Sequence, residues 1–222
     1  MSKKVKVSII FLFFAVVVVG MFLAEISGSY LHRAKHYNIP ASSMLPTLEV
    51  GDQFLIKKVF SVFGEKYSPN RGDVLVFWND KAGVDYVKRL IGLPGERIQV
   101  RMGKVFINDV PIERVRKDDF VVRNGSFTGD RMQRFTETLP NGRQYQVLEY
   151  VEDGQLDNTQ EYVVPEGHLF FMGDNRDNSI DSRVLSATGF VPIESVKGVA
   201  KHIYYSGSEK SFVWRLVGPV DD

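Results

Sequence analysis

The sequence predicts a mostly β protein, with an N-terminal transmembrane helix followed by an all-β domain that contains an inserted β subdomain. Two observations lead to this prediction. An uncharged apolar stretch lies close to the N-terminus, and beyond residue 36 short apolar runs alternate with clusters of Gly, Pro and Asn. No long amphipathic helix pattern and no internal repeat follows the apolar stretch.

Residues 7–24 form the predicted anchor. They contain no charged side chain, and at ~1.5 Å per residue a helix of this length reaches about 27 Å, enough for the hydrocarbon core of a bilayer. The apolar region of a cleavable signal usually has ~7–15 residues, so the longer stretch favours an uncleaved anchor. The small residues at 27–29 leave cleavage open as an alternative.

The charges around this segment predict its orientation. Three lysines precede the span at positions 3, 4 and 6, and positive charges remain on the cytoplasmic side. We therefore expect residues 1–6 in the cytoplasm and the rest of a single-pass chain outside it.

Five regions beyond the anchor have the pattern of strands. A continuous apolar run at 74–78 predicts a strand buried on both faces. Two hairpins are expected, because turn residues separate strand-like runs in each case. The strand-like regions are 74–78, 98–100 with 105–107, 135–139 with 143–147, 168–172 and 199–205.

The amino-acid composition of the sequence changes in the middle of this domain. Residues 102–164 are more polar and richer in turn residues than the segments on either side. We therefore expect a β core formed by residues 37–101 and 165–206, interrupted by an inserted β subdomain over 102–164.

Composition excludes several functions. The chain has 28 Lys and Arg against 27 Asp and Glu, a net charge of +1, which argues against a nucleic-acid partner. It has no cysteine, so a thiolate nucleophile and a cysteine zinc site are excluded. The closely spaced histidines, His32 and His36, enclose two cationic residues. We predict no metal and no cofactor.

Three segments carry candidate chemistry. Residues 39–47 place a serine pair between two prolines, which restrict the backbone around a hydroxyl. Lys88 and Arg89 lie next to each other in a strand-like run, so the pleat sends them to opposite faces. If one face is buried, one cation is buried, and a buried lysine tends to lose its proton and can serve as a general base. An edge strand with both cations at the surface is the alternative.

The third segment, residues 173–183, is rich in short polar side chains. A calcium loop is the competing interpretation. The EF-hand pattern requires a central glycine and a terminal glutamate at fixed offsets, and Arg176 lies among the potential ligands. We therefore favour a rigid polar network, in which the side chains of this segment form hydrogen bonds with the backbone of the same segment.

Together these segments resemble the bacterial type I signal peptidases. The family's P-x-x-S-M-x-P-T, R-G-D, K-R-x-x-G-x-P-G-[ED] and G-D-N-R-D-N-S-x-D-S-R motifs match residues 40–47, 71–73, 88–96 and 173–183, in the family's order and behind an N-terminal anchor. The resemblance implies a membrane-bound serine endopeptidase that removes signal peptides from exported preproteins after small-x-small sites.

The resemblance also implies roles for single residues. Ser43, which directly precedes Met44, is the expected nucleophile, and Lys88 is the expected general base. Ser179 is expected to orient the lysine amine, and Asp181 with Arg183 to form a supporting ion pair. The expected substrate-binding residues are Tyr37, Ile39, Pro40, Ala41, Met44, Phe54, Val76, Tyr86 and Val87.

One position departs from the family. Many members carry a serine two residues before the nucleophile, where its hydroxyl helps to bind the oxyanion, and this chain has Ala41. Loss of one oxyanion donor costs on the order of 10²–10³ in rate, so another donor is expected to compensate.

The implied partners are preproteins and the lipid bilayer, with no nucleic acid and a monomeric enzyme in the bacterial inner membrane. Three alternatives stay open. A self-cleaving repressor would share the Ser/Lys chemistry but carry a DNA-binding segment. A pilin or conjugation maturation peptidase would differ mainly in substrate. An anchored β domain without catalysis would not need Ser43, Lys88 and Ser179 together.

Overall fold

The computed structural model describes residues 34–58, 68, 70–151 and 153–217. The chain divides into two compact units, 1–35 and 36–222, and the second holds almost all of the described residues. The predicted cytoplasmic segment 1–6 and the predicted anchor 7–24 lie outside the described residues. Within the described ranges, no helix combines the length and apolar character needed to cross a membrane.

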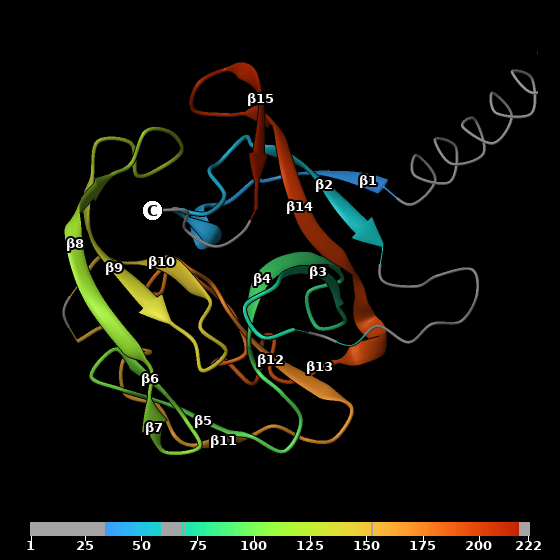
Figure 1. Ribbon diagram of the computed structural model, residues 1–222, viewed down its shortest axis with the longest axis vertical. Coiled ribbons are helices and arrows are strands. Elements are labelled where there is room, and N and C mark those ends of the chain that lie inside the picture. Colours follow the sequence, from blue (N-terminus) through green and yellow to red (C-terminus); the bar gives the residue numbers. More distant parts are fainter. Residues whose placement is uncertain (1–33, 59–67, 69, 152, 218–222) are drawn as a thin grey trace, which may run out of the picture. The chain divides into compact units, whose positions relative to one another are not determined.

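A large eight-stranded sheet runs through the second unit (Figure 1). Its order is β1-β2-β14-β3-β4-β12-β13, and β15 pairs with β14 beside this path. The pairs that β14 makes with β2, β3 and β15 are antiparallel, as is the pair of β3 with β4. The strands are β1 (Ala34–Asn38), β2 (Gln53–Lys58), β3 (Val74–Asn79), β4 (Val84–Gly92), β12 (His168–Met172), β13 (Val191–Pro192), β14 (Val196–Ser206) and β15 (Ser211–Leu216).

Two smaller antiparallel sheets are formed by the middle of the chain. One has the order β10-β9-β8 and the other β11-β5-β6-β7. Their strands are β5 (Arg97–Arg101), β6 (Lys104–Ile107), β7 (Val110–Pro111), β8 (Glu113–Val121), β9 (Arg131–Thr138), β10 (Gln144–Glu149) and β11 (Tyr162–Val163).

The prediction of a mostly β chain is confirmed for the described residues, whose helical elements are only the short 3-10 turns η1 (Ser42–Met44) and η2 (Ile193–Ser195). Both predicted hairpins are present as β5–β6 and β9–β10. The two small sheets begin at β5, five residues before the predicted start of the inserted subdomain at 102. The division into core and insertion remains a prediction.

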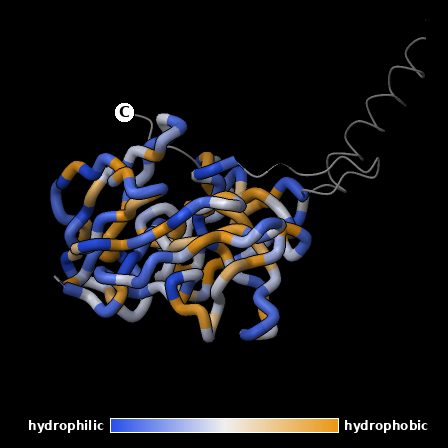
Figure 2. The backbone as a smooth tube through the Cα atoms, turned by 90° about the horizontal axis from the view of Figure 1, so that it is seen from below, coloured by the Kyte–Doolittle hydropathy of each residue, from blue (hydrophilic) through white to orange (hydrophobic). Residues whose placement is uncertain are grey.

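Hydrophobic side chains cover both faces of the large sheet. Along β3, Val74 and Val76 belong to one buried cluster, whereas Leu75 and Phe77 belong to another. This double burial explains the continuous apolar run in the sequence. A third cluster joins the large sheet to the small sheets, with members such as Phe170 from β12. Figure 2 shows hydrophobic residues along the central strands and hydrophilic residues in many of the connecting loops.

Phe171 and Phe212 provide a matched test of this core. Phe171 is 0% exposed and stacks on Phe77 with ring centroids 4.5 Å apart, whereas Phe212 on β15 is 84% exposed. We expect Phe171→Ala to lower the free energy of unfolding by about 3–5 kcal/mol, since it leaves a cavity. Phe212→Ala should change it by about 0.5 kcal/mol or less. Urea unfolding measures both, and equal losses would contradict the assigned core.

Candidate active site

Ser43 lies in the short turn η1, which is fixed by its neighbours. The Leu45 N–H donates to the Ser42 carbonyl (3.1 Å), and the Leu48 N–H donates to the Met44 carbonyl (2.9 Å). Met44 and Leu48 are both fully buried in the cluster beneath β3. A turn held by two buried side chains keeps the serine hydroxyl in one place.

Strand β4 brings a lysine to this hydroxyl. The Lys88 amine donates a hydrogen bond to Ser43 Oγ, with Nζ and Oγ 2.8 Å apart, and a second one to the Val87 carbonyl at 3.0 Å. The pleat sends Lys88 and Arg89 to opposite faces, as predicted, and both faces are buried, so the alternative of an edge strand with both cations at the surface is wrong. Lys88 is 4% exposed and Arg89 2%, because the sheet is covered on both sides.

The environment of Lys88 favours the neutral amine. Burial lowers its pKa from 10.5 to about 8, against a smaller opposing effect of the Asp181 and Asp174 carboxylates. A lysine with this pKa is partly neutral near neutral pH, and its lone pair can then accept the proton of an adjacent hydroxyl.

Arg89 is paired on the other face of β4. Its Nε and Nη2 donate to the two carboxylate oxygens of Asp174 at 2.8 and 2.6 Å, and its Nη1 donates to the Gly72 carbonyl at 2.8 Å. The guanidinium also lies over the Tyr145 ring, 4.3 Å from its centroid. This ion pair was not among the sequence predictions, although burial of Arg89 in a covered strand is costly unless the guanidinium is paired.

The segment 173–183 forms a polar network of its own. Asp181 receives Arg183 Nε and Nη2, each at 2.9 Å, and the Gly173 N–H at 2.9 Å. Burial alone would raise the pKa of Asp181, but these donors outweigh it and lower the pKa. The predicted pair of Asp181 and Arg183 is therefore an ion pair in the structure.

The same segment is hydrogen-bonded to the backbone of the serine turn. The Asn175 backbone N–H donates to the Ser43 carbonyl, and its side-chain amide donates to the Ser42 carbonyl, both at 3.1 Å. Gly173 lies so close that a Cβ there would come within 2.6 Å of the Ser43 carbonyl oxygen and 2.2 Å of Ser179 Oγ. Only glycine fits at this position without displacing the turn.

Ser179 lies beside this glycine, buried within the network. Within the part of the chain that the structure describes, its hydroxyl makes no hydrogen bond of ordinary geometry, with Lys88 or with any other group. The orienting role implied by the family resemblance therefore stays a prediction.

Most of the predicted substrate-binding residues lie together. Tyr37, Ile39, Met44, Phe54, Val76 and Val87 share one hydrophobic cluster, in which the Tyr37 and Phe54 rings stack with centroids 5.9 Å apart. Pro40 and Ala41 are exposed just before η1. Tyr86 belongs to the cluster on the other side of β3 and β4, and its ring centroid is 5.1 Å from Lys88 Nζ.

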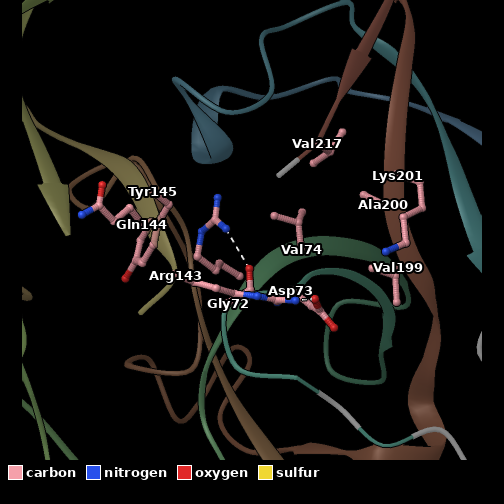
Figure 3. Close-up of a pocket in the computed structure, with 11 residues that line it drawn as sticks. Gly72, Asp73, Val74, Arg143, Gln144, Tyr145, Val199, Ala200, Lys201 and Val217 are labelled. Carbon is pink, nitrogen blue, oxygen red and sulfur yellow. Dashed lines mark hydrogen bonds and ion pairs between the residues drawn. The ribbon is translucent and has the colours of Figure 1, made fainter. Parts of the chain in front are cut away.

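A pocket also opens where β3 begins, between β10 and β14 (Figure 3). Arg143, Lys201 and Asp73 give it a polar lining, and Val74 and Val217 supply apolar walls. Its lining includes Arg89 and Tyr145 but neither Ser43 nor Lys88. Among the described residues, no group of three His, Cys, Asp or Glu could hold a metal ion.

A serine hydroxyl in contact with a buried lysine of lowered pKa defines the class of site. It is the arrangement of a serine hydrolase whose general base is an amine.

A family model described as "Signal peptidase, peptidase S26" matches residues 5–205. Signal peptidase I of Rickettsia typhi is 43% identical over 146 residues, covering 62% of this chain and 53% of the relative. Signal peptidase I of Rickettsia conorii is 37% identical over 196 residues, covering 77% of this chain and 71% of the relative. This chain belongs to the peptidase S26 signal peptidase family.

The chain spans about half the length of most of the curated relatives it matches. A solved signal peptidase I from Enterococcus faecalis is 31% identical, covering 60% of this chain and 96% of that one, with a TM-score of 0.35.

The lowered pKa of Lys88 should make the free energy of unfolding depend on pH. Because the folded protein binds this proton less tightly than the unfolded chain, stability rises with pH between about 8 and 10.5. Below pH 8 the charged, buried Lys88 destabilises the fold by up to ~3 kcal/mol. We expect Lys88→Met to be more stable than the wild type at pH 6.5, with most of this gain lost by pH 11. Chemical denaturation at both pH values measures it, and a gain independent of pH would contradict the shift.

Proposed function

We propose that this protein is a membrane-bound serine endopeptidase that removes N-terminal signal peptides from exported preproteins, with Ser43 as nucleophile and Lys88 as general base. The observation that carries the proposal is the 2.8 Å contact between Lys88 Nζ and Ser43 Oγ in a buried site that lowers the lysine pKa. Membership of the signal peptidase family supports the substrate class.

Catalysis proceeds in two halves. Neutral Lys88 takes the Ser43 proton while Oγ attacks the carbonyl carbon of the scissile bond. The resulting ammonium gives its proton to the leaving amine, so the mature protein departs and the signal peptide remains as an ester on Ser43. A water then loses a proton to Lys88 and attacks the ester carbonyl. The bond between the acyl carbon and Ser43 Oγ breaks, Lys88 returns the proton to Oγ, and the signal peptide leaves with a free carboxyl group.

The substrate binds as an extended strand, with alternate side chains entering pockets. Ile39, Tyr86 and Val87 lie near the two small pockets, and Tyr37, Phe54 and Val76 close the deeper of the two. Apolar walls that leave room for a methyl group explain a preference for small residues at −1 and −3. The backbone N–H of Ser43 binds the oxyanion, and a donor other than residue 41 assists it.

The same proposal includes the location of the enzyme. Residues 7–24 anchor it in the bacterial inner membrane, residues 1–6 lie in the cytoplasm, and the β domain acts as a monomer on the outer face. The lipid bilayer and exported preproteins are its partners, and it needs neither metal nor cofactor.

The first test is cleavage of a preprotein with an Ala-x-Ala site by the full chain in detergent. We expect the wild type to cut at that site, with kcat/KM rising with pH and levelling off above about pH 8, as Lys88 loses its proton. Lys88→Ala should lower kcat by at least ~10³-fold. Cleavage by both proteins would remove Lys88 from the base role, and cleavage by neither would favour a specialised substrate or a non-catalytic domain.

Adjacent serines give a matched test of the nucleophile. Ser43→Ala should abolish cleavage, because no other hydroxyl contacts Lys88 Nζ among the described residues. Ser42→Ala should retain activity within about threefold, since its backbone carbonyl, not its side chain, is the group that Asn175 binds. If Ser42→Ala were the inactive variant, the nucleophile would be misassigned.

A further inference from the structure

The three-stranded sheet contributes a buried carboxylate that the proposed mechanism does not use. Glu137 on β9 is completely buried. It receives Arg176 Nη1 and Nη2 at 3.0 and 2.5 Å, and the Tyr145 hydroxyl at 2.7 Å. A carboxylate with three donors and no solvent is held in one geometry, and so are its partners.

Arg176 transmits this restraint to the polar segment. Its Nε donates to the Gly173 carbonyl at 3.1 Å, so the side chain closes a loop over residues 173–176. The backbone of the same residues is joined to β10, because the Leu148 N–H donates to the Asp174 carbonyl and the Arg176 N–H donates to the Leu148 carbonyl, at 2.8 and 2.9 Å. The segment is thus tied to the three-stranded sheet by side chain and by backbone.

Asn175 lies inside that loop and makes the contacts to the serine turn. Its two hydrogen bonds, to the Ser42 and Ser43 carbonyls, join the polar segment to the serine turn itself. A third hydrogen bond, from Thr47 Oγ1 to Asp174 at 2.5 Å, joins the segment to the residues that follow the turn. A displacement of Arg176 therefore moves Asn175, and with it the position of Ser43 Oγ relative to Lys88.

We propose that Glu137 is a positioning residue for the reaction, acting on Ser43 through Arg176 and Asn175, and that the three-stranded sheet is thereby part of the catalytic apparatus. The inference rests on the proposed peptidase function and adds a role for a sheet that contains neither Ser43 nor Lys88. Glu137 itself contacts no reacting atom, so its loss should affect kcat and leave KM nearly unchanged.

The test compares two Glu→Gln substitutions in the full-length enzyme. Glu137→Gln should lower kcat about 10- to 100-fold, the cost of a misplaced reacting group, with KM within about twofold of the wild type. Glu149→Gln removes a second ion pair of the same sheet, to Arg114 at 2.6 Å, and should leave both constants within about twofold. An unchanged kcat in Glu137→Gln, or an equal loss in Glu149→Gln, would overturn the proposal.

A milder variant covers the case in which Glu137→Gln does not fold, because breaking a buried ion pair is strongly destabilising. Tyr145→Phe keeps both charges and removes the hydroxyl that donates to Glu137 and accepts a hydrogen bond from Arg176 Nη2 at 3.3 Å. We expect it to lower kcat about threefold at unchanged KM, and a kcat equal to that of the wild type would count against the proposal.

A second readout separates this inference from the function on which it rests. If the wild type cuts no preprotein, the rate at which a fluorophosphonate probe labels Ser43 is measured by mass spectrometry instead. Slower labelling in Glu137→Gln than in the wild type and Glu149→Gln would support the positioning role. Equal rates in all three would overturn it.

Discussion

The balance of buried charge is the constraint on which the candidate site depends. Three guanidinium groups, of Arg89, Arg176 and Arg183, are each paired with one buried carboxylate, of Asp174, Glu137 and Asp181 respectively. Each carboxylate of this set is already bound to a guanidinium, and the attraction of Asp181 and Asp174 for the Lys88 ammonium is smaller than the cost of burying that ammonium. The Lys88 pKa is therefore lowered although two carboxylates lie near the amine.

The network also explains why elements far apart in the sequence meet so closely. Strand β4 supplies Lys88 and Arg89, and the turn η1 supplies Ser43. The segment after β12 contacts both elements, because Asp174 binds Arg89 of β4 and Asn175 binds the backbone of η1. Each contact is short and directional, and charged pairs of this kind tolerate little displacement once they are buried. The relative position of Ser43 and Lys88 therefore depends on the whole network and not on η1 or β4 alone.

Sequence reasoning worked where the signal was local. The run at 74–78 and the turn at 140–142 predicted β3 and the β9–β10 hairpin, because a buried strand and a tight turn each depend on a few residues that are adjacent in the sequence. Strand β8 was missed, since almost all of its side chains are exposed and it owes its conformation to pairing with β9. The partners of Arg89 and Arg176 lie 85 and 39 positions away, and single-sequence patterns carry no information about such pairings. The motif resemblance located Ser43 and Lys88, but not the carboxylate on β9.

The long separation between Asn175 and the serine turn, 133 positions from Ser42, has a consequence for biogenesis. Domains rich in such distant contacts fold slowly, and during synthesis the N-terminal part emerges well before residues 173–183. Until that segment arrives, the serine turn lacks the hydrogen bonds of Asn175, and Lys88 lacks its neighbours Asp174 and Asp181. On the proposed function, the reactive arrangement of Ser43 and Lys88 therefore forms only after almost all of the β domain has been made.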